Sequence, residues 1–292
     1  MKNIAFKLTL AIVALVVIGS LQGCGDDAPN DYQPKVYVEG YLIVDQPLEG
    51  IKVTYTQSIR DSFELERAMI KDAQVILKIN GEPHTLAYQS GEKPGFALAG
   101  AVVLPETTYE LEIRTKAGEV VTGKTLTPER IQWTVEPKAN IHYPQDTMKL
   151  GPVDSLEIGW TRAKGIDFYL ISVECLDTLN YGKYLPAPTN EMNRRCYNFN
   201  INGEEEMYRY KTTWGFISNS KSPTVWTAFK WFGPQRVTVY AADYNMCQWF
   251  VNMYFTGSTA THEKTNSVTG GVGVFGSAAL ATKDVFLYKN QP

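Results

Sequence analysis

The side chains that most often carry catalysis are few and scattered in this sequence. Its three histidines, His84, His142 and His262, belong to no His-x-x-x-His pattern, and the cysteines form no Cys-x-x-Cys pattern. No Gly-x-Ser-x-Gly nucleophile turn is present. A run of three acids, Glu204 to Glu206, lacks the alternating spacing of a calcium loop. Glycosidase carboxylates meet only in the fold and leave no sequence pattern. We therefore expect no enzyme, and neither a metal nor a cofactor.

Cys24 is the one residue whose setting specifies a chemistry. A positive segment, residues 1–7, precedes the apolar run Leu8–Ile18, and Leu-Gln-Gly-Cys ends at Cys24. The run is shorter than the roughly 20 residues that span a bilayer but suits a secretory signal peptide. Its end resembles the lipobox of bacterial lipoproteins, in which the thiol is acylated and the chain is cut before the cysteine. We expect residues 1–23 to be a signal peptide and Cys24 to carry the lipid. The alternatives are an ordinary signal peptide or an uncleaved anchor.

Residues 24–33 follow as a short acidic segment rich in turn formers, including Asp26, Asp27 and Asp31. Such a composition is typical of a flexible tether. It also resembles the acidic export signal of surface-exposed lipoproteins in the Bacteroidota. We therefore expect an outer-membrane location with the protein facing the cell surface, although any tether tends to be polar.

Three further cysteines are Cys175, Cys196 and Cys247. An exported protein meets an oxidising compartment, so one pair can be bridged and one cysteine left over. Cys175 with Cys196 would close a modest loop and is the favoured disulfide. Three buried free thiols remain the alternative.

Apolar and polar residues alternate along short segments from Lys35 to Leu126, as they do in half-buried strands. Asn80-Gly81 and Ala117-Gly118 each separate two such segments, which predicts hairpins. A helical turn is expected between Ser62 and Ile70. The pattern predicts an immunoglobulin-like or prealbumin-like β-sandwich over residues 34–128.

The second region, residues 129–292, reads as a fibronectin-like β-rich domain. Its expected strands include Thr224–Phe232 and Val285–Tyr288. Helical spacing of apolar residues predicts one helix, with Asp243 as its N-cap and Phe255 as its end. The glycines from Gly270 to Gly276 lack a following lysine, so we expect a bulge or close backbone approach there rather than a phosphate loop.

Aromatic residues are concentrated between positions 181 and 232. They include Tyr181, Tyr184, Trp214, Trp226, Trp231 and Phe232. Such rings stack on sugars and anchor protein interfaces, but they also fill β-sandwich cores. The strand positions fit the core. Tyr181, Tyr184 and Trp231 lie near proline and glycine and are the candidates for contact with a glycan, a peptide ligand or a partner.

The whole mature chain also resembles a family of Bacteroidota outer-membrane lipoproteins known only as a domain of unknown function. The resemblance is carried by the lipobox, Val38-Glu39-Gly40, Pro94-Gly95-Phe96, the Thr108–Leu111 strand, the aromatic helix and the Gly-Val-Phe-Gly-Ser segment near the end. Such lipoproteins are often encoded beside TonB-dependent receptors. The resemblance implies a two-part β lipoprotein that assists a receptor in uptake, and it implies no catalytic residues. The insert Tyr181–Asn202 and the extra cysteines depart from it.

Charge is nearly balanced, with a formal net charge of -3, and no basic stripe points to nucleic acid. The favoured function is a non-catalytic accessory or binding lipoprotein for a TonB-dependent uptake system. The alternatives are an adhesive or fimbria-associated lipoprotein, which would exchange an edge strand, and a glycan-active enzyme, which would need a cleft with paired carboxylates.

Overall fold

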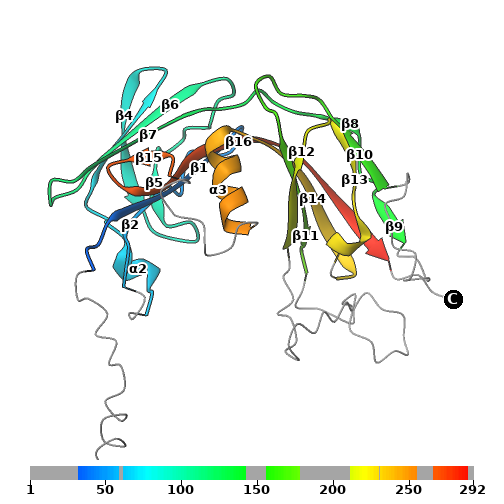
Figure 1. Ribbon diagram of the computed structural model, residues 1–292, viewed down its shortest axis with the longest axis horizontal. Helices are drawn as coiled ribbons and strands as arrows, with labels where there is room; N and C mark the ends of the chain where they lie inside the picture. The colour runs from blue at the N-terminus through cyan, green and yellow to red at the C-terminus, as the bar shows by residue number, and fades with distance from the viewer. Residues whose placement is uncertain are drawn as a thin grey trace, which may run out of the picture.

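A computed structural model describes residues 32–58, 62–142, 156–177, 211–229, 231–254 and 266–288. Within these ranges the protein is mainly β, as predicted, and it forms two sandwiches joined in a bent arrangement (Figure 1). One sheet runs through both sandwiches, in the order β12-β11-β14-β16-β1-β2 with β9 beside β16. Sheets β15-β7-β6-β3-β4-β5 and β13-β10-β8 each cover one half of it.

The first sandwich follows the predicted alternation closely. Its strands are β1 (Val36–Ile43), β2 (Lys52–Tyr55), β3 (Gln74–Ile79), β4 (Glu82–Gln89), β5 (Gly95–Ala97), β6 (Thr108–Arg114) and β7 (Val120–Leu126). Asn80-Gly81 joins β3 to β4 with φ values of 48° and 90°, which confirms that hairpin. Gly118, with φ of 89°, lies in the turn between β6 and β7. The expected helical turn is α2 (Leu65–Ala68).

The second sandwich differs from the sequence prediction in two elements. It contains β8 (Trp133–Val135), β9 (Asn140–His142), β10 (Glu157–Trp160), β11 (Tyr169–Cys175), β12 (Lys211–Ile217), β13 (Lys221–Pro223) and β14 (Gly233–Ala242). The strand predicted at Thr224–Phe232 is wrong, because a 3-10 turn, η3 (Trp226–Ala228), inserts its aromatic residue into the core. The strand predicted at Val285 begins earlier, since β16 runs unbroken from Val272 to Tyr288.

β16 links the two sandwiches. Its first part pairs with β1 in parallel, from Val272 opposite Tyr37, and its second part pairs with β14 antiparallel, up to Leu287 opposite Gly233. The short strand β15 (Val268–Thr269) adds to β7. The sequence divides into two regions at residue 128, but β15 and β16, near the end of the chain, contribute strands to both sandwiches.

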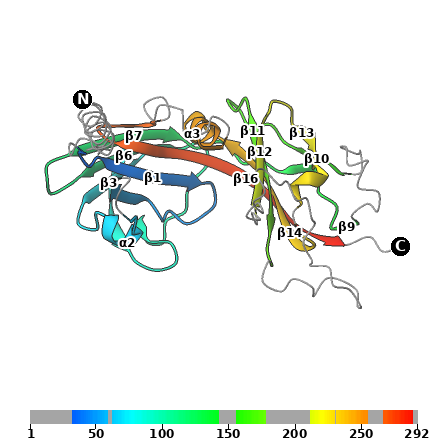
Figure 2. The same ribbon diagram turned by 60° about the horizontal axis from the view of Figure 1, so that its bottom comes forward.

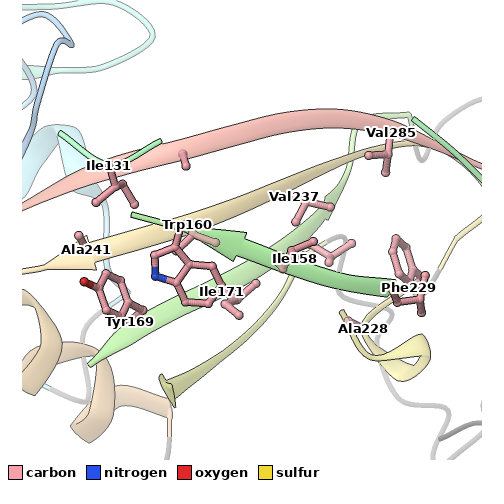
Figure 3. Packing of buried hydrophobic residues seen from close by; sticks show 14 of the residues in the cluster. Ile131, Ile158, Trp160, Tyr169, Ile171, Ala228, Phe229, Val237, Ala241 and Val285 are labelled. Atoms are coloured by element: carbon pink, nitrogen blue, oxygen red, sulfur yellow. The ribbon is translucent and has the colours of Figure 1, made fainter. Parts of the chain in front are cut away.

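Each sandwich has its own apolar core. In the second, Trp160, Tyr169, Phe229 and neighbouring aliphatic side chains fill the space between the shared sheet and β10 (Figure 3). The predicted core positions Trp226 and Phe232 belong to this cluster. In the first, Phe275 of β16 is fully buried beside the strands from the N-terminal half.

The helix α3 (Tyr244–Tyr254) lies against the bend of the shared sheet, on the face opposite the two cores (Figure 1). Its Cys247 packs with Leu170, Ala242 and Ala278, which come from three strands. Trp249 meets Tyr37 of β1 with ring centroids 6.1 Å apart.

Asp243 caps this helix, as predicted, and is the polar centre of the junction. Its Oδ1 accepts the backbone N–H of Met246 at 2.9 Å and that of Ser277 at 3.1 Å. Thr125 of β7 donates to Oδ2 at 2.5 Å, and its hydroxyl lies 2.7 Å from that of Ser277. One carboxyl group therefore holds together the helix, β7 and β16. Burial raises the pKa of Asp243, and these hydrogen bonds offset the effect only in part.

The glycines near the chain end allow close backbone approach, as predicted. A Cβ on Gly273, whose φ is +124°, would lie 2.0 Å from the carbonyl oxygen of Val38 in β1. A Cβ on Gly276 would lie 2.8 Å from the backbone nitrogen of Met246 in α3. A side chain at either position would force apart elements that are in direct backbone contact.

Replacing Asp243 with Ala should lower the free energy of unfolding by about 2–4 kcal/mol, because a helix cap is lost and two buried N–H groups lose their acceptor. Urea unfolding measures this. Asp72→Ala is the control, since the side chain of Asp72 is exposed and forms an ion pair with the exposed Lys116, and its effect should be far smaller. Equal losses for the two variants would contradict the assigned role.

The raised pKa of Asp243 also predicts a pH dependence. The folded state binds this proton more tightly than the unfolded chain, so the stabilisation is complete below the unfolded pKa of about 3.9 and is lost as pH rises through the folded pKa. Asp243→Asn cannot titrate. The advantage of the natural protein over this variant, measured by urea unfolding, should therefore shrink as the pH rises above about 4. A constant or growing advantage would refute the raised pKa.

Gly273→Ala should destabilise the protein by more than about 3 kcal/mol or prevent folding, because the new methyl group overlaps the β1 backbone. Gly100→Ala is the matched control: its φ is +75°, yet no atom lies within 4 Å of the added carbon. We expect a loss of about 1 kcal/mol there. Thermal unfolding of both variants compares them, and similar melting temperatures would disprove the close approach.

Candidate binding surface on the shared sheet

The outer face of the shared sheet in the second sandwich presents a row of polar and aromatic side chains. Alternate residues of β11, β14 and β16, such as Ile171, Val239 and Ala281, point into the core, so those between them face outward. We call this outward set the platform. It consists of His142, Ser172, Glu174, Lys211, Arg236, Thr238, Tyr240, Thr282, Asp284, Phe286 and Tyr288.

Three hydroxyl and amine groups meet near the middle of the platform. Lys211 Nζ donates to Tyr240 Oη at 2.9 Å and also lies 5.5 Å from the centre of that ring. Ser172 Oγ lies 3.3 Å from the same hydroxyl, and Glu174 lies 3.9 Å from the ammonium group. Ser172 is only 1% exposed. A buried hydroxyl cannot reach a substrate, so this trio can hold the strands and present polar atoms but is poorly placed for nucleophilic catalysis.

A forked ion pair crosses the next two strands. Arg236 donates from Nε and Nη2 to the two oxygens of Asp284, at 2.8 Å and 3.0 Å. The guanidinium group holds the pKa of Asp284 below its usual range through this hydrogen bond. Lys211 and Arg236 each have an acidic partner, Glu174 and Asp284. These pairs therefore give the platform little net electrostatic attraction for a strongly charged ligand.

The far end of the platform is aromatic. Tyr288 stacks on His142 with ring centroids 5.1 Å apart and planes 17° apart, and it contacts Phe286 at 4.4 Å. Tyr288 is 40% exposed. Flat rings beside paired polar groups suit ligands with both apolar faces and hydroxyl or amide groups, such as neutral sugars or polar peptides.

Trp231 is the one described member of the predicted contact residues. It is partly buried at the start of β14, where its carbonyl oxygen accepts the side-chain amide of Gln235 at 3.0 Å. Gln235 pairs with Cys175 at the end of β11, so Trp231 lies near that end of the strand. Tyr181 and Tyr184 lie outside the described residues, as do Cys24, His262 and Glu204 to Glu206.

The described cysteines are buried free thiols. Cys175 lies at the end of β11 and Cys247 in α3. Burial raises the pKa of both thiols, and the nearby Asp243 adds to the effect at Cys247. Cys196, the predicted disulfide partner of Cys175, lies outside the described residues, so that disulfide stays a prediction.

Sequence reasoning missed the platform, because its residues are spread over five strands and share no motif. It also passed over a pattern: Gly118 to Thr125 matches the Gly-x-x-x-x-Gly-Lys-Thr spacing of phosphate-binding loops. The structure gives this match no such role. Most of it forms β7, in which Gly123 pairs with Leu111 and Lys124 binds Glu110 at 2.8 Å, and no helix follows.

A shallow hollow of about 400 Å³ lies over the outer face of β6 and β7, beside β15 and the start of α3. Lys78, Glu110, Lys124 and Asn245 line it. Within the described ranges no three metal-ligating side chains gather, and no helix there is long and apolar enough to span a bilayer.

Two sandwiches that share a continuous strand define the class of this molecule: a mainly β protein with one sheet common to both halves. The chain belongs to the family described as domain of unknown function DUF4249, whose model matches residues 26–260. No curated protein matches the sequence. The matched range ends before β15 and β16.

The buried thiols should be inert in the folded protein. With Cys196→Ser in the unlipidated chain from residue 25, we expect Cys175 and Cys247 to react about 100-fold more slowly with a maleimide than in urea, because a raised pKa and burial both suppress the thiolate. Mass spectrometry counts the labels. Rapid modification of either cysteine under native conditions would show that its burial is wrong.

Proposed function

We propose that this protein is a non-catalytic accessory lipoprotein, anchored through Cys24 to the outer membrane and facing the cell surface, that serves a TonB-dependent uptake system. The observation that carries the proposal is the order of positive segment, apolar run and Leu-Gln-Gly-Cys at the start of the chain. Two or three acyl chains on one cysteine hold a protein stably at a membrane, whereas a single chain does not.

Three further observations support this reading. Residues 25–31 are acidic and rich in turn formers, as a surface-export tether requires. The platform offers exposed rings and internally paired charges, which suits recognition of a neutral polar ligand or a partner. Ser172, the hydroxyl at the centre of the platform, is buried and so is poorly placed for nucleophilic catalysis.

Cys24→Ser should reduce the membrane-bound fraction of the protein by more than about tenfold, because both the acylation site and the cleavage signal are lost. Cell fractionation with incorporation of labelled palmitate measures this, and Cys196→Ser is the matched control. Full membrane retention of the Cys24 variant would disprove the lipid anchor.

To identify the partner, the natural protein is extracted from membranes in mild detergent, and the proteins that co-purify with it are identified by mass spectrometry. The same extraction is repeated with two platform variants, Tyr288→Ala and Arg236→Ala. A TonB-dependent receptor in stoichiometric amount, lost or weakened in a platform variant, is the expected result. Self-association or a fimbrial subunit would instead favour the adhesive alternative, in which an end strand of a sheet, such as β12, would pair with another chain.

A further inference from the structure

The length of the tether limits where the membrane can lie. This step rests on the proposed lipid on Cys24. Tyr32, the first described residue, is eight positions after Cys24, and a chain of eight steps reaches at most about 29 Å. Tyr32 donates its hydroxyl to Thr56 at 2.5 Å, and Lys35 donates its backbone N–H to the same oxygen at 2.9 Å. These two hydrogen bonds hold the first described residues against the end of β2.

The opposite end of the molecule lies beyond this reach. β16 starts beside the start of β1, with Val272 opposite Tyr37, and continues for 17 residues to Tyr288. At about 3.3 Å per residue that strand is roughly 55 Å long. The second sandwich extends away from the start of β1 in both views (Figure 2). The start of β1 is thus the end that the anchor holds near the lipid.

The surface at this end has the composition of a membrane contact. Phe63, just before α2, is 63% exposed, and Tyr32 is 45% exposed. The chain leaves the end of β2 and returns to it after α2, where Met69 forms a bridge with Thr54. Phe63 lies between these two points, next to α2. Aromatic rings are enriched at the boundary between lipid headgroups and acyl chains.

Several charged residues in and near α2 lie in ion pairs. Lys71 binds Glu66 at 2.6 Å, Arg67 lies 3.6 Å from Glu64, and Lys116 lies 2.8 Å from Asp72. Charges paired in this way neither draw the surface strongly to anionic headgroups over a distance nor strongly oppose close approach. The tether supplies the high local concentration that such a weak contact needs.

We propose that the end of the first sandwich marked by Tyr32 and Phe63 rests on the outer leaflet that holds the anchor, with the ring of Phe63 at the lipid interface. The second sandwich and the far end of the platform then project from the membrane. The contact sets the orientation of the molecule, while the acyl chains provide its affinity.

The test uses the full, lipidated protein purified from membranes, with Cys196→Ser as background and an environment-sensitive thiol dye at Phe63→Cys. Val135→Cys, a residue of the second sandwich that is 46% exposed, is the matched control. Mass spectrometry first verifies the acyl chains on Cys24. The protein is then placed in vesicles of phosphatidylcholine and phosphatidylethanolamine containing spin-labelled lipid.

We expect the dye at position 63 to shift to the blue and to lose at least about half of its emission to the spin label, as a probe at the lipid interface does, and the dye at position 135 to change little. Equal emission at both positions in an acylated protein would overturn the orientation while leaving the anchor intact. A chain without acyl groups that stays off the vesicles would overturn the proposed function and the orientation together.

Discussion

The arrangement of the whole molecule depends on a buried carboxyl group. Asp243 accepts hydrogen bonds from α3, which follows it directly, from β16, 34 residues further along the chain, and from Thr125 of β7, 118 residues earlier. An ionised carboxyl group in an apolar junction is costly, so burial raises its pKa. The cost is tolerated because the same oxygens satisfy N–H groups that would otherwise be buried without an acceptor. The junction between the two sandwiches therefore has one preferred geometry.

That geometry in turn explains the composition of the chain end. The segment from Gly270 to Ser277 must pass between β1, β7 and the first turn of α3. Gly273 and Gly276 leave no room for a side chain, whereas Phe275 between them is fully buried in the first core. Glycine is needed at position 273 because the backbone of β1 lies against it, and at position 276 because the backbone of α3 does. A flexible linker between the sandwiches would need neither these glycines nor the buried Phe275. We therefore expect the two sandwiches to move as one rigid unit.

Much of this fold could be predicted from local sequence, and the limits are physical. The Asn80-Gly81 turn, the strands around it and the Asp243 cap each depend on residues a few positions apart, so their signals survive in sequence. The path of β16 depends on pairing with β1, more than two hundred residues earlier in the chain (Tyr37 opposite Val272), which no local pattern records. The turn at Trp226 was missed for the same reason. Its aromatic and β-branched residues favour a strand locally, but burial of the Trp226 ring in the second core, a long-range contact, goes with a 3-10 turn.

The candidate surface shows even more clearly the difference between features that depend on neighbouring residues and features that depend on residues far apart in the chain. The proposed anchor rests on consecutive residues, so a sequence pattern suffices to suggest it, whereas the platform exists only because β9, β11, β12, β14 and β16 are adjacent. Tyr240 and Lys211, for example, are neighbours only after β11 has placed their two strands on either side of it. Of the aromatic residues that sequence singled out, Trp226 and Phe232 are core. The rings of His142 and Tyr288, which the sequence did not mark as contact residues, are the exposed aromatic residues of the platform. Exposure at a sheet end, rather than aromatic density along the chain, therefore decides where this protein can make contact.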